Sequence, residues 1–194
     1  MRLLVPLDGS ALAETVLAPA AFLAAALSAP SCGRLHLIRV LPSSGFTEAG
    51  GASGRLKQRA RDHAQAYLQA QSQRLREGAM GQLSLSVTTS VVFQSNVADA
   101  LVQVAEATQP DAETAEAGER CDIIALSTHG LSGLSHPRIG STAARILQEV
   151  HLPVLVVHQA EDAQQSQENA QPMSRPQEER NQWMDSKDTS SWVI

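Results

Sequence analysis

Two segments of the sequence combine residue types that could hold a phosphorylated ligand. The first follows an early apolar run and contains Pro6, Leu7 and Asp8, with Gly9 and Ser10 directly after them. The carboxylate of Asp8 could accept hydrogen bonds from a ribose hydroxyl or an adenine amine. It could equally be a turn residue whose oxygens accept bonds from nearby backbone N–H groups. The spacing alone favours neither interpretation over the other.

The second segment is a loop rich in glycine and hydroxyl residues that leads into a predicted helix. Its candidate residues are Ser127, Thr128, His129, Gly130, Gly133, Gly140, Ser141 and Thr142. Glycine lets the backbone approach phosphate oxygens closely, and a helix N-terminus offers N–H groups and a positive dipole end to an anion. The alternative is a flexible loop before an ordinary capped helix. The sequence contains neither the Gly-Lys-Ser/Thr of a P-loop nor a G-x-G-x-x-G fingerprint after its first apolar run.

The elements that must position these segments alternate between short apolar runs and longer helical stretches. We predict strands at 2–7, 35–41, 83–93, 122–127 and from Val154 to His158, and helices from Ser10 to about 27, at 55–77, at 97–107 after a cap at Ser95 or Asn96, and at 141–150. This alternation is typical of an α/β fold in which helices cover both faces of a parallel sheet. In such an open sheet the ligand lies outside the carboxyl ends of the strands, where the strand order reverses. The loops after the first and fourth strands would flank that point.

Composition and charge argue against several classes of function. The net charge is −5 and aromatic residues make up 3% of the chain, so we expect neither the basic stripe nor the aromatic stacking surfaces of a nucleic-acid binder. The apolar run at 17–27 is shorter than the ~20 residues that span a bilayer. Asp8 and Glu14 would interrupt the core of any signal peptide. We therefore expect a cytoplasmic protein with neither a nucleic-acid nor a membrane partner.

One domain, residues 1–158, and a tail, residues 159–194, are expected. The chain is 43% hydrophobic, which is enough for a single core. Beyond Gln159 the sequence is rich in Gln, Glu, Ser and Asp and poor in aliphatic residues, so this part cannot bury enough apolar surface to order itself. The two cysteines, Cys32 and Cys121, are expected to remain ordinary thiols in a reducing compartment.

Taken together, the motifs resemble those of the universal stress protein family. The resemblance rests on three C-terminal stretches, namely Leu-Ser-Thr-His-Gly-Leu-Ser-Gly-Leu at 126–134, Ile-Gly-Ser-Thr-Ala-Ala-Arg-Ile-Leu at 139–147 and Leu-Pro-Val-Leu-Val-Val at 152–157. Near the N-terminus, 5–10 resembles the family's Val-Pro-x-Asp-Gly-Ser. The resemblance covers 1–158 and implies a Rossmann-like, open five-stranded parallel sheet in the order 3-2-1-4-5. It also implies a homodimer and, in one subclass, an ATP site.

The ATP-binding subclass carries the pattern Gly-x2-Gly-x9-Gly-Ser/Thr. The matching positions here are Ser127, Gly130, Gly140 and Ser141, and the family's adenine-side contacts match Pro6, Asp8 and Val40. Two departures stand out. Ser127 replaces the first glycine, which would weaken the site rather than remove it, and His136-Pro137-Arg138 replaces a basic residue followed by apolar ones. The resemblance implies ATP as the ligand, with Mg²⁺ bound through its phosphates, and no metal site of the protein's own is expected.

Three functions are compatible with this sequence. The leading hypothesis is a stress-response module that binds ATP or a related adenine nucleotide for regulation, as a homodimer paired through the edge strand from Val154 to His158. The second is an enzyme, at most a slow ATPase or nucleotidyl transferase. It is disfavoured because no lysine occurs in 122–158 to stabilise developing phosphate charge. The third is a stress-protein dimer that has lost nucleotide binding, suggested only by Ser127.

Overall fold

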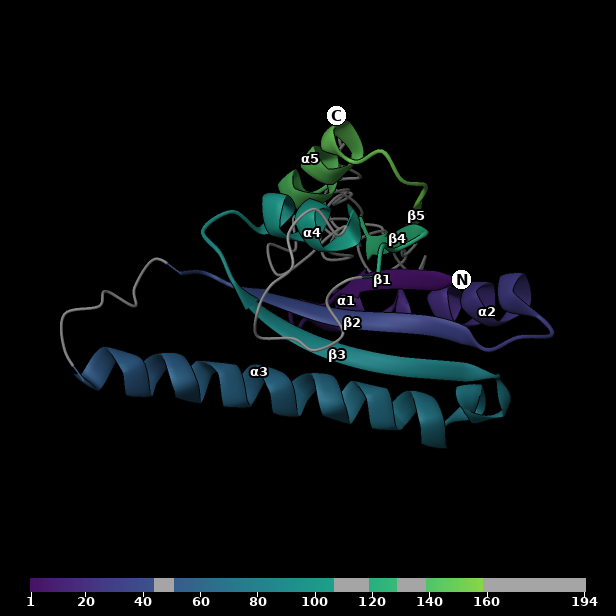
Figure 1. Cartoon of the computed structure of the whole chain (residues 1–194), viewed down its shortest axis with the longest axis horizontal. Coiled ribbons are helices and arrows are strands. Elements are labelled where there is room, and N and C mark those ends of the chain that lie inside the picture. Colours follow the sequence, from purple (N-terminus) through teal and green to yellow (C-terminus); the bar gives the residue numbers. More distant parts are fainter. Residues whose placement is uncertain (44–50, 107–118, 129–138, 159–194) are drawn as a thin grey trace, which may run out of the picture. The chain divides into compact units, whose positions relative to one another are not determined.

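The structure is a computed structural model that describes residues 1–43, 51–106, 119–128 and 139–158 (Figure 1). The chain divides into two units, Met1–Gln159 and Ala160–Ile194, and the described residues belong to the first. The tail predicted to be disordered lies outside the described residues.

Five parallel strands form one open sheet with the order β3-β2-β1-β4-β5 (Figure 1). The strands are β1 (Arg2–Pro6), β2 (Gly33–Leu41), β3 (Leu85–Phe93), β4 (Ile123–Ser127) and β5 (Val154–Val157). The order reverses at β1, which pairs with β2 on one side and with β4 on the other. The predicted α/β class and the strand order implied by the family resemblance are both confirmed.

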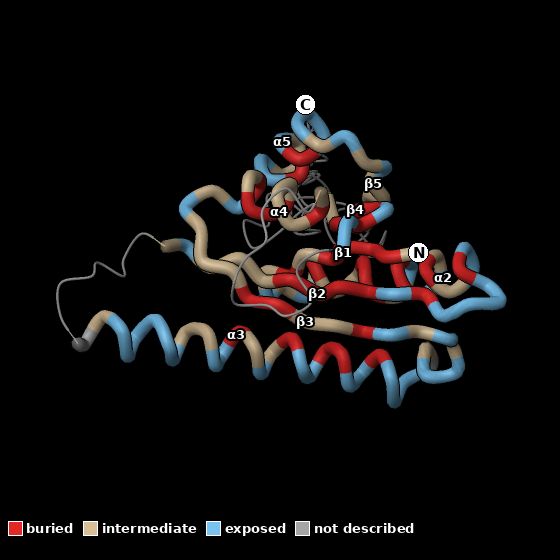
Figure 2. The backbone as a smooth tube through the Cα atoms, viewed as in Figure 1, coloured by how far each residue is buried: buried red, intermediate tan, exposed pale blue. Residues whose placement is uncertain are grey.

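Helices cover both faces of this sheet. The face formed with α2 (Leu17–Ser28) and α3 (Gly51–Glu77) holds one core cluster, and the face formed with α4 (Val97–Glu106) and α5 (Ser141–Glu149) holds the other. Two short elements, α1 (Ala11–Glu14) and the 3-10 helix η1 (Ala79–Gln82), complete the described part. Figure 2 shows that α3 alternates between buried positions toward the sheet and exposed positions away from it, as expected for an amphipathic surface helix.

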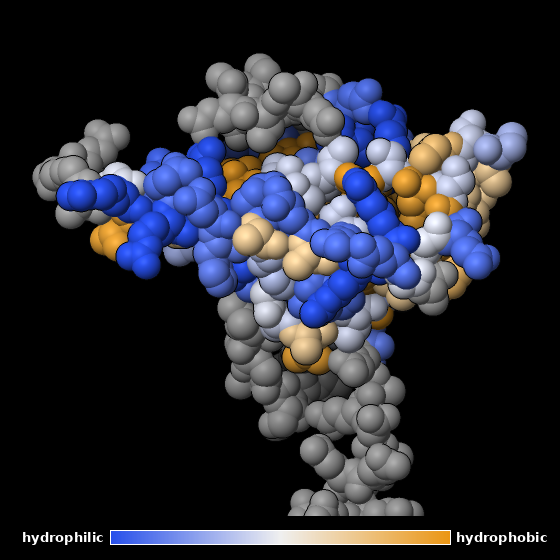
Figure 3. Space-filling view, turned by 90° about the horizontal axis from the view of Figure 1, so that it is seen from below, coloured by the Kyte–Doolittle hydropathy of each residue, from blue (hydrophilic) through white to orange (hydrophobic). Residues whose placement is uncertain are grey.

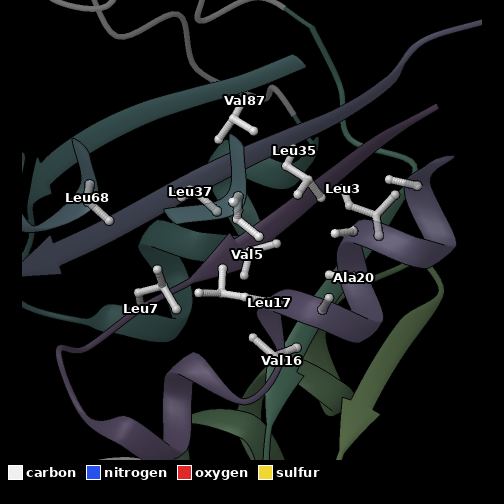
Figure 4. Packing of buried hydrophobic residues seen from close by; sticks show 14 of the residues in the cluster. Leu3, Val5, Leu7, Val16, Leu17, Ala20, Leu35, Leu37, Leu68 and Val87 are labelled. Atoms are coloured by element: carbon white, nitrogen blue, oxygen red, sulfur yellow. The ribbon is translucent and has the colours of Figure 1, made fainter. Parts of the chain in front are cut away.

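The central strand is apolar at successive positions because it is buried on both faces. Leu3 and Val5 of β1 belong to the cluster under α2 and α3, while Leu4 belongs to the cluster under α4 and α5. All three side chains are fully buried. Successive side chains of a strand point to opposite faces, so a strand covered on both sides needs an apolar residue at each position. Figure 4 shows the first cluster, in which Val16 and Leu17 lie beside the β1 side chains.

The predicted helix from Ser10 to about residue 27 is divided into α1 and α2. Ser10 caps α1 as predicted, since its Oγ accepts a hydrogen bond from the Ala13 N–H at 3.1 Å. Pro19 explains the division: it has no N–H for the carbonyl of Thr15, four residues earlier, and its ring would clash with that carbonyl in a continuous helix. The chain turns at Thr15, whose hydroxyl donates to the Leu12 carbonyl at 2.7 Å. Pro19 then lies in the first turn of α2, where the missing N–H has no intrahelical partner to lose.

Most other boundaries agree with the predictions to within two residues. The largest shift is at α3, which begins at residue 51 rather than 55. Of the two predicted caps of α4, the structure uses Asn96, whose Oδ1 accepts a hydrogen bond from the Ala98 N–H at 3.1 Å. Cys32 and Cys121 are both free thiols, the first exposed and the second buried.

The segment Ala11–Ser28 has the length and composition of a membrane-spanning helix. In the structure, however, Val16, Ala20 and Ala24 are fully buried against the sheet. A helix that forms part of a core needs the same apolar composition as one that crosses a bilayer. Packing in the core explains the apolar residues on the side that faces the sheet, whereas Phe22 and Leu27 of the same segment are more than half exposed.

Candidate functional site

A cavity of about 470 Å³ opens where β1, β2 and β4 end, within the range of roughly 300–1,000 Å³ that is usual for small-molecule sites. It lies at the reversal of strand order, as the sequence predicts. The predicted residues that line it are Pro6, Leu7, Asp8, Val40, Ser127, Thr128, Gly140, Ser141 and Thr142. His129, Gly130 and Gly133 are outside the described residues. The structure thus brings both predicted segments to one cavity.

The turn after β1 fixes the orientation of the Asp8 carboxylate. Its Oδ1 accepts two hydrogen bonds from Ser10, one from the backbone N–H at 2.8 Å and one from the hydroxyl at 2.6 Å. Gly9 between them has φ +92°, a left-handed conformation that glycine adopts without strain. The local bonds confirm the turn interpretation of Asp8. The residue also lines the cavity, and a bond from its carboxylate to a ligand stays a prediction.

The opposite wall of the cavity is the first turn of α5. Gly140 occupies the position before the helix, and within the described residues no side chain caps the backbone N–H groups that follow it. Its own N–H donates to the Thr128 carbonyl at 2.7 Å, which fixes the helix start against the end of β4. Ser141 and Thr142 are exposed and line the cavity. Their N–H groups, at the positive end of the helix dipole, are suited to bind an anion.

Gly140 has little room for a side chain. A Cβ atom built there would lie 3.2 Å from the Thr128 carbonyl oxygen, closer than side-chain carbons usually approach an oxygen. Its backbone angles, φ −58° and ψ 153°, are accessible to any residue. Glycine suits this position because the backbone comes close to the end of β4, and not because the backbone conformation is unusual.

An apolar wall connects the two polar ones. Ile38 and Val40 of β2, Val97 and Leu101 of α4 and Ile146 of α5 contribute to the lining. Such a surface suits the flat, weakly polar ring of a nucleobase. Only Val40 was predicted from the sequence. The apolar residues of α4 and α5 have the spacing of ordinary core positions, so nothing in their pattern separates a ligand wall from a core.

Arg39 is a cavity residue that sequence reasoning missed. Its guanidinium lies beside the Asp8 turn, with Nη2 3.1 Å from where a Cβ of Gly9 would be. It also stacks on the ring of Tyr67, 5.1 Å from the ring centroid, in the geometry of a cation–π contact. A charged residue inside the apolar run Leu-His-Leu-Ile-Arg-Val-Leu of β2 was the available signal.

Tyr67 is itself held in place by Glu14. The phenol donates to Glu14 Oε1 at 3.0 Å, and the Gln71 amide donates to the same oxygen at 2.8 Å. Burial, and then the bond to Glu14, raise the pKa of Tyr67 well above its ordinary value, so the phenol remains a donor at physiological pH. Helix α3 thereby supports Arg39 and, through it, the turn that carries Asp8.

The sequence model of the universal stress protein family matches residues 1–158. The chain belongs to the universal stress protein family. Hypothetical protein MJ0577 has a solved structure that is 19% identical, with a TM-score of 0.62 over 82% of this chain and 96% of that one. None of the curated proteins compared with the chain is a significant match.

Two further solved structures of the family have a nucleotide bound. A universal stress protein in complex with cAMP is 18% identical, with a TM-score of 0.54 over 81% of this chain and 96% of that one. A universal stress protein family protein from Arabidopsis thaliana with AMP bound is 14% identical, with a TM-score of 0.53 over 84% of this chain and 94% of that one. At these identities the likeness establishes the shared fold.

Proposed function

We propose that this universal stress protein binds an adenine nucleotide, ATP in the first instance, in the cavity between the Asp8 turn and the first turn of α5. The observation that carries the proposal is the meeting of three different walls in one cavity: a carboxylate, an apolar surface and an uncapped helix N-terminus. A nucleotide has the complementary parts, namely a ribose, a base and phosphates. The relatives with bound cAMP and AMP support the same class of ligand.

Each wall has a proposed role. Pro6, Asp8 and Val40 would contact the nucleoside, with the carboxylate of Asp8 accepting from a ribose hydroxyl or the adenine amine. Gly140, Ser141 and Thr142 would bind the phosphates through backbone N–H groups and hydroxyls. Mg²⁺ would be bound by the phosphates, because among the described residues no group of three or more His, Cys, Asp or Glu could hold a metal ion.

The proposed role is regulatory binding rather than turnover. Fast phosphoryl transfer needs a group that positions water at the terminal phosphate and a cation on the developing charge. Asp8, the acidic residue among the described cavity residues, stands at the proposed nucleoside end and is already bonded to Ser10. Arg39 lies beside the Asp8 turn. We therefore expect at most slow hydrolysis.

Identification of the nucleotide tests the proposal directly. The full chain is purified without added nucleotide and denatured, and the released small molecules are analysed by mass spectrometry. The purified protein is then titrated with ATP, AMP and cAMP, each with and without Mg²⁺, by calorimetry. Binding of at least one of these nucleotides in one-to-one ratio is expected. No released nucleotide, together with no heat for any of them at millimolar concentration, would favour a family member that has lost the ligand.

We further propose that the module acts in the cytoplasm as a homodimer paired through β5. This strand ends the sheet, and an exposed edge has backbone groups that can pair with another chain. A two-fold axis would let two copies satisfy each other. Light scattering of the full chain at micromolar concentration should give twice the mass of one chain. Val156 packs in part against the core under α4 and α5, and if it also faces the partner, Val156→Lys should reduce the mass to that of one chain. A single-chain mass for the unmodified protein would contradict this part of the proposal.

A further inference from the structure

The opposite edge of the sheet has a feature that nucleotide binding does not use. Strand β3 lies at this edge and is nine residues long, against four for β5. It contains no proline and no charged residue, and its register with β2 continues without a bulge over all nine pairs. Long edges without such protection invite pairing with another strand.

The backbone groups that point outward from β3 can be assigned from its end bonds. The Ser84 carbonyl accepts from Gly33 at 2.9 Å and the Gln94 N–H donates to Leu41 at 3.0 Å, so the even-numbered residues of this strand face β2. The odd-numbered residues between them must direct their N–H and C=O groups away from the sheet.

Two of these outward positions have open backbone groups. The Val87 carbonyl accepts a hydrogen bond from Arg76 Nη2 at 3.2 Å. Within the described residues, the outward N–H and C=O groups of Thr89 and Val91 have no hydrogen-bond partner. Arg76 thus covers the outward carbonyl of Val87 and leaves the two following outward positions, Thr89 and Val91, uncovered.

A polar hollow of about 640 Å³ adjoins this edge, between β3 and α3. Its lining residues are Gln69, Ser72, Gln73, Arg76, Glu77, Val87, Thr88 and Thr89. Figure 3 looks at the molecule from the α3 side and shows that hydrophilic side chains dominate this face. The hollow can therefore accept the side chains of an added strand, provided that they are polar.

The position of helix α3 limits which kind of strand can pair with β3. The helix packs over β3 on the sheet face that it shares with α2, and Figure 1 shows it running alongside this strand. A second copy that paired antiparallel through its own β3 would therefore bring its α3 to the same face. Two packed helices need about 8–10 Å between their axes, and the same face of the sheet cannot hold both at a single added strand's distance. A lone extended segment brings no helix with it and meets no such obstacle.

The basic residues near the β3 edge indicate that the added segment is acidic. Helix α3 contains six basic and two acidic residues, whereas the whole chain has a net charge of −5. The cations lie at both ends of the β3 edge: Lys57 and Arg61 are 5.0 and 5.4 Å from the ring centroid of Phe93, and Arg76 is at Val87. An acidic segment is therefore complementary to this edge at both of its ends.

The geometry points to the β3 edge as a docking site for an extended, acidic segment of a partner protein, which adds to the sheet as a sixth strand. Its backbone pairs with Thr89 and Val91, the mode of recognition that other sheet edges use for peptides. One N–H group of the segment donates to the Val87 carbonyl in place of Arg76. The guanidinium of Arg76 is released by this exchange and pairs with a carboxylate of the segment.

The test uses the full chain and a fluorescent nine-residue peptide in which glutamate alternates with valine or threonine. Fluorescence anisotropy should show saturable binding. Hydrogen exchange should slow at the Thr89 and Val91 amides, while the Thr88 and Ser90 amides, which already face β2, should stay unchanged. Thr89→Pro removes one outward N–H at a position where an edge strand tolerates proline, and it should weaken binding about tenfold.

Matched probes and variants separate strand addition from simple charge attraction. A peptide of the same composition that is N-methylated on alternate residues should not bind, and Arg76→Glu should weaken binding of the parent peptide. Arg120→Glu makes the same charge change at an exposed residue just before β4 and should have no effect. Equal binding of the methylated and parent peptides, protection that misses Thr89 and Val91, or no binding of the parent peptide at millimolar concentration would each overturn the proposal. A folded Thr89→Pro variant with unchanged affinity would do the same.

Discussion

The polar cluster around His36 and the first turn of α5 differ in how their hydrogen-bonding groups are satisfied. His36 of β2 is 6% exposed, and its two ring nitrogens lie 2.8 Å from the hydroxyls of Thr88 and Ser90. At α5, the N–H groups that follow Gly140 have no side-chain cap from the part of the chain that the structure describes. A polar group buried without a hydrogen-bond partner costs free energy. Buried polar groups are therefore usually paired within the protein, whereas groups that meet solvent or a ligand can remain without a protein partner. The satisfied bonds of His36 indicate a structural role, whereas the open N–H groups of α5 support the binding role that we propose for this helix.

The sharpest test of this contrast is Gly140→Val, which should have the largest effect. Its Cβ must already approach the Thr128 carbonyl oxygen to 3.2 Å, and a branched side chain would cover the N–H groups that we assign to the phosphates. We expect a loss of ATP affinity of more than about 100-fold, equivalent to about 3 kcal/mol, measured by calorimetry. The fold should persist, because the backbone angles of Gly140 are accessible to valine.

Gly54 provides the matched control for that variant. A Cβ at Gly54, in α3, would have no atom within 4 Å. Gly54→Val should therefore leave the ATP affinity unchanged, although both variants introduce the same side chain. An unaltered ATP affinity in folded Gly140→Val protein would show that the phosphates bind elsewhere.

The His36 cluster should instead affect stability, through pH. Burial, and then the charge of Arg2, lower the pKa of His36 from 6.5 to about 4. Between these pH values the unfolded chain binds a proton that the folded chain does not, so the stability contribution is complete above about pH 6.5 and is lost as the pH falls to about 4. The loss should reach about 3 kcal/mol in denaturant titrations.

His36→Gln isolates this contribution from that of the carboxylates. The variant keeps hydrogen-bonding groups near Thr88 and Ser90 but does not titrate. Its stability should fall less steeply than that of the unmodified chain between pH 6.5 and 4, while its ATP affinity at neutral pH should stay the same. If the free energy of unfolding falls equally with pH in the two proteins, His36 is not the cause of the pH dependence.

The same contrast explains how much could be predicted from the sequence. Alternating apolar runs predicted the sheet, and the carboxyl ends of its strands brought Asp8 and Gly140 together as expected. Arg39 was missed because a strand residue gives no sign of which loop its side chain will reach. The division of α1 from α2 followed from Pro19 and could have been predicted. The part of the cavity wall formed by Leu101 and Ile146 could not, since the spacing of these residues equals that of core residues.

Substitution of Asp8 should have an intermediate effect on ATP affinity, because its carboxylate already accepts local hydrogen bonds but also lines the cavity. Its Oδ1 is bonded to Ser10, yet the residue lines the cavity, so it combines features of both regions compared above. Asp8→Ala removes the proposed acceptor for the nucleoside and should lower the ATP affinity about tenfold, or about 1.4 kcal/mol. Calorimetry with inorganic triphosphate, which lacks a nucleoside, should show no difference between Asp8→Ala and the unmodified chain. A loss of triphosphate binding in that variant would contradict the assignment of this wall.

Ser10 should give the smallest effect on binding, because it acts only through its neighbours. Its hydroxyl donates to Asp8 Oδ1 at 2.6 Å and accepts from the Ala13 N–H at 3.1 Å, so Ser10→Ala removes both an anchor of the carboxylate and the cap of α1. Loss of such a cap costs about 1 kcal/mol of stability, measurable by denaturant unfolding. The ATP affinity should fall by less than it does in Asp8→Ala, because the Ser10 N–H still holds the carboxylate at 2.8 Å. Ser10→Thr retains the hydroxyl and should restore both quantities. If Ser10→Ala weakens ATP binding as much as Asp8→Ala, the turn bonds, and not the exposure of the carboxylate to the cavity, determine what Asp8 contributes.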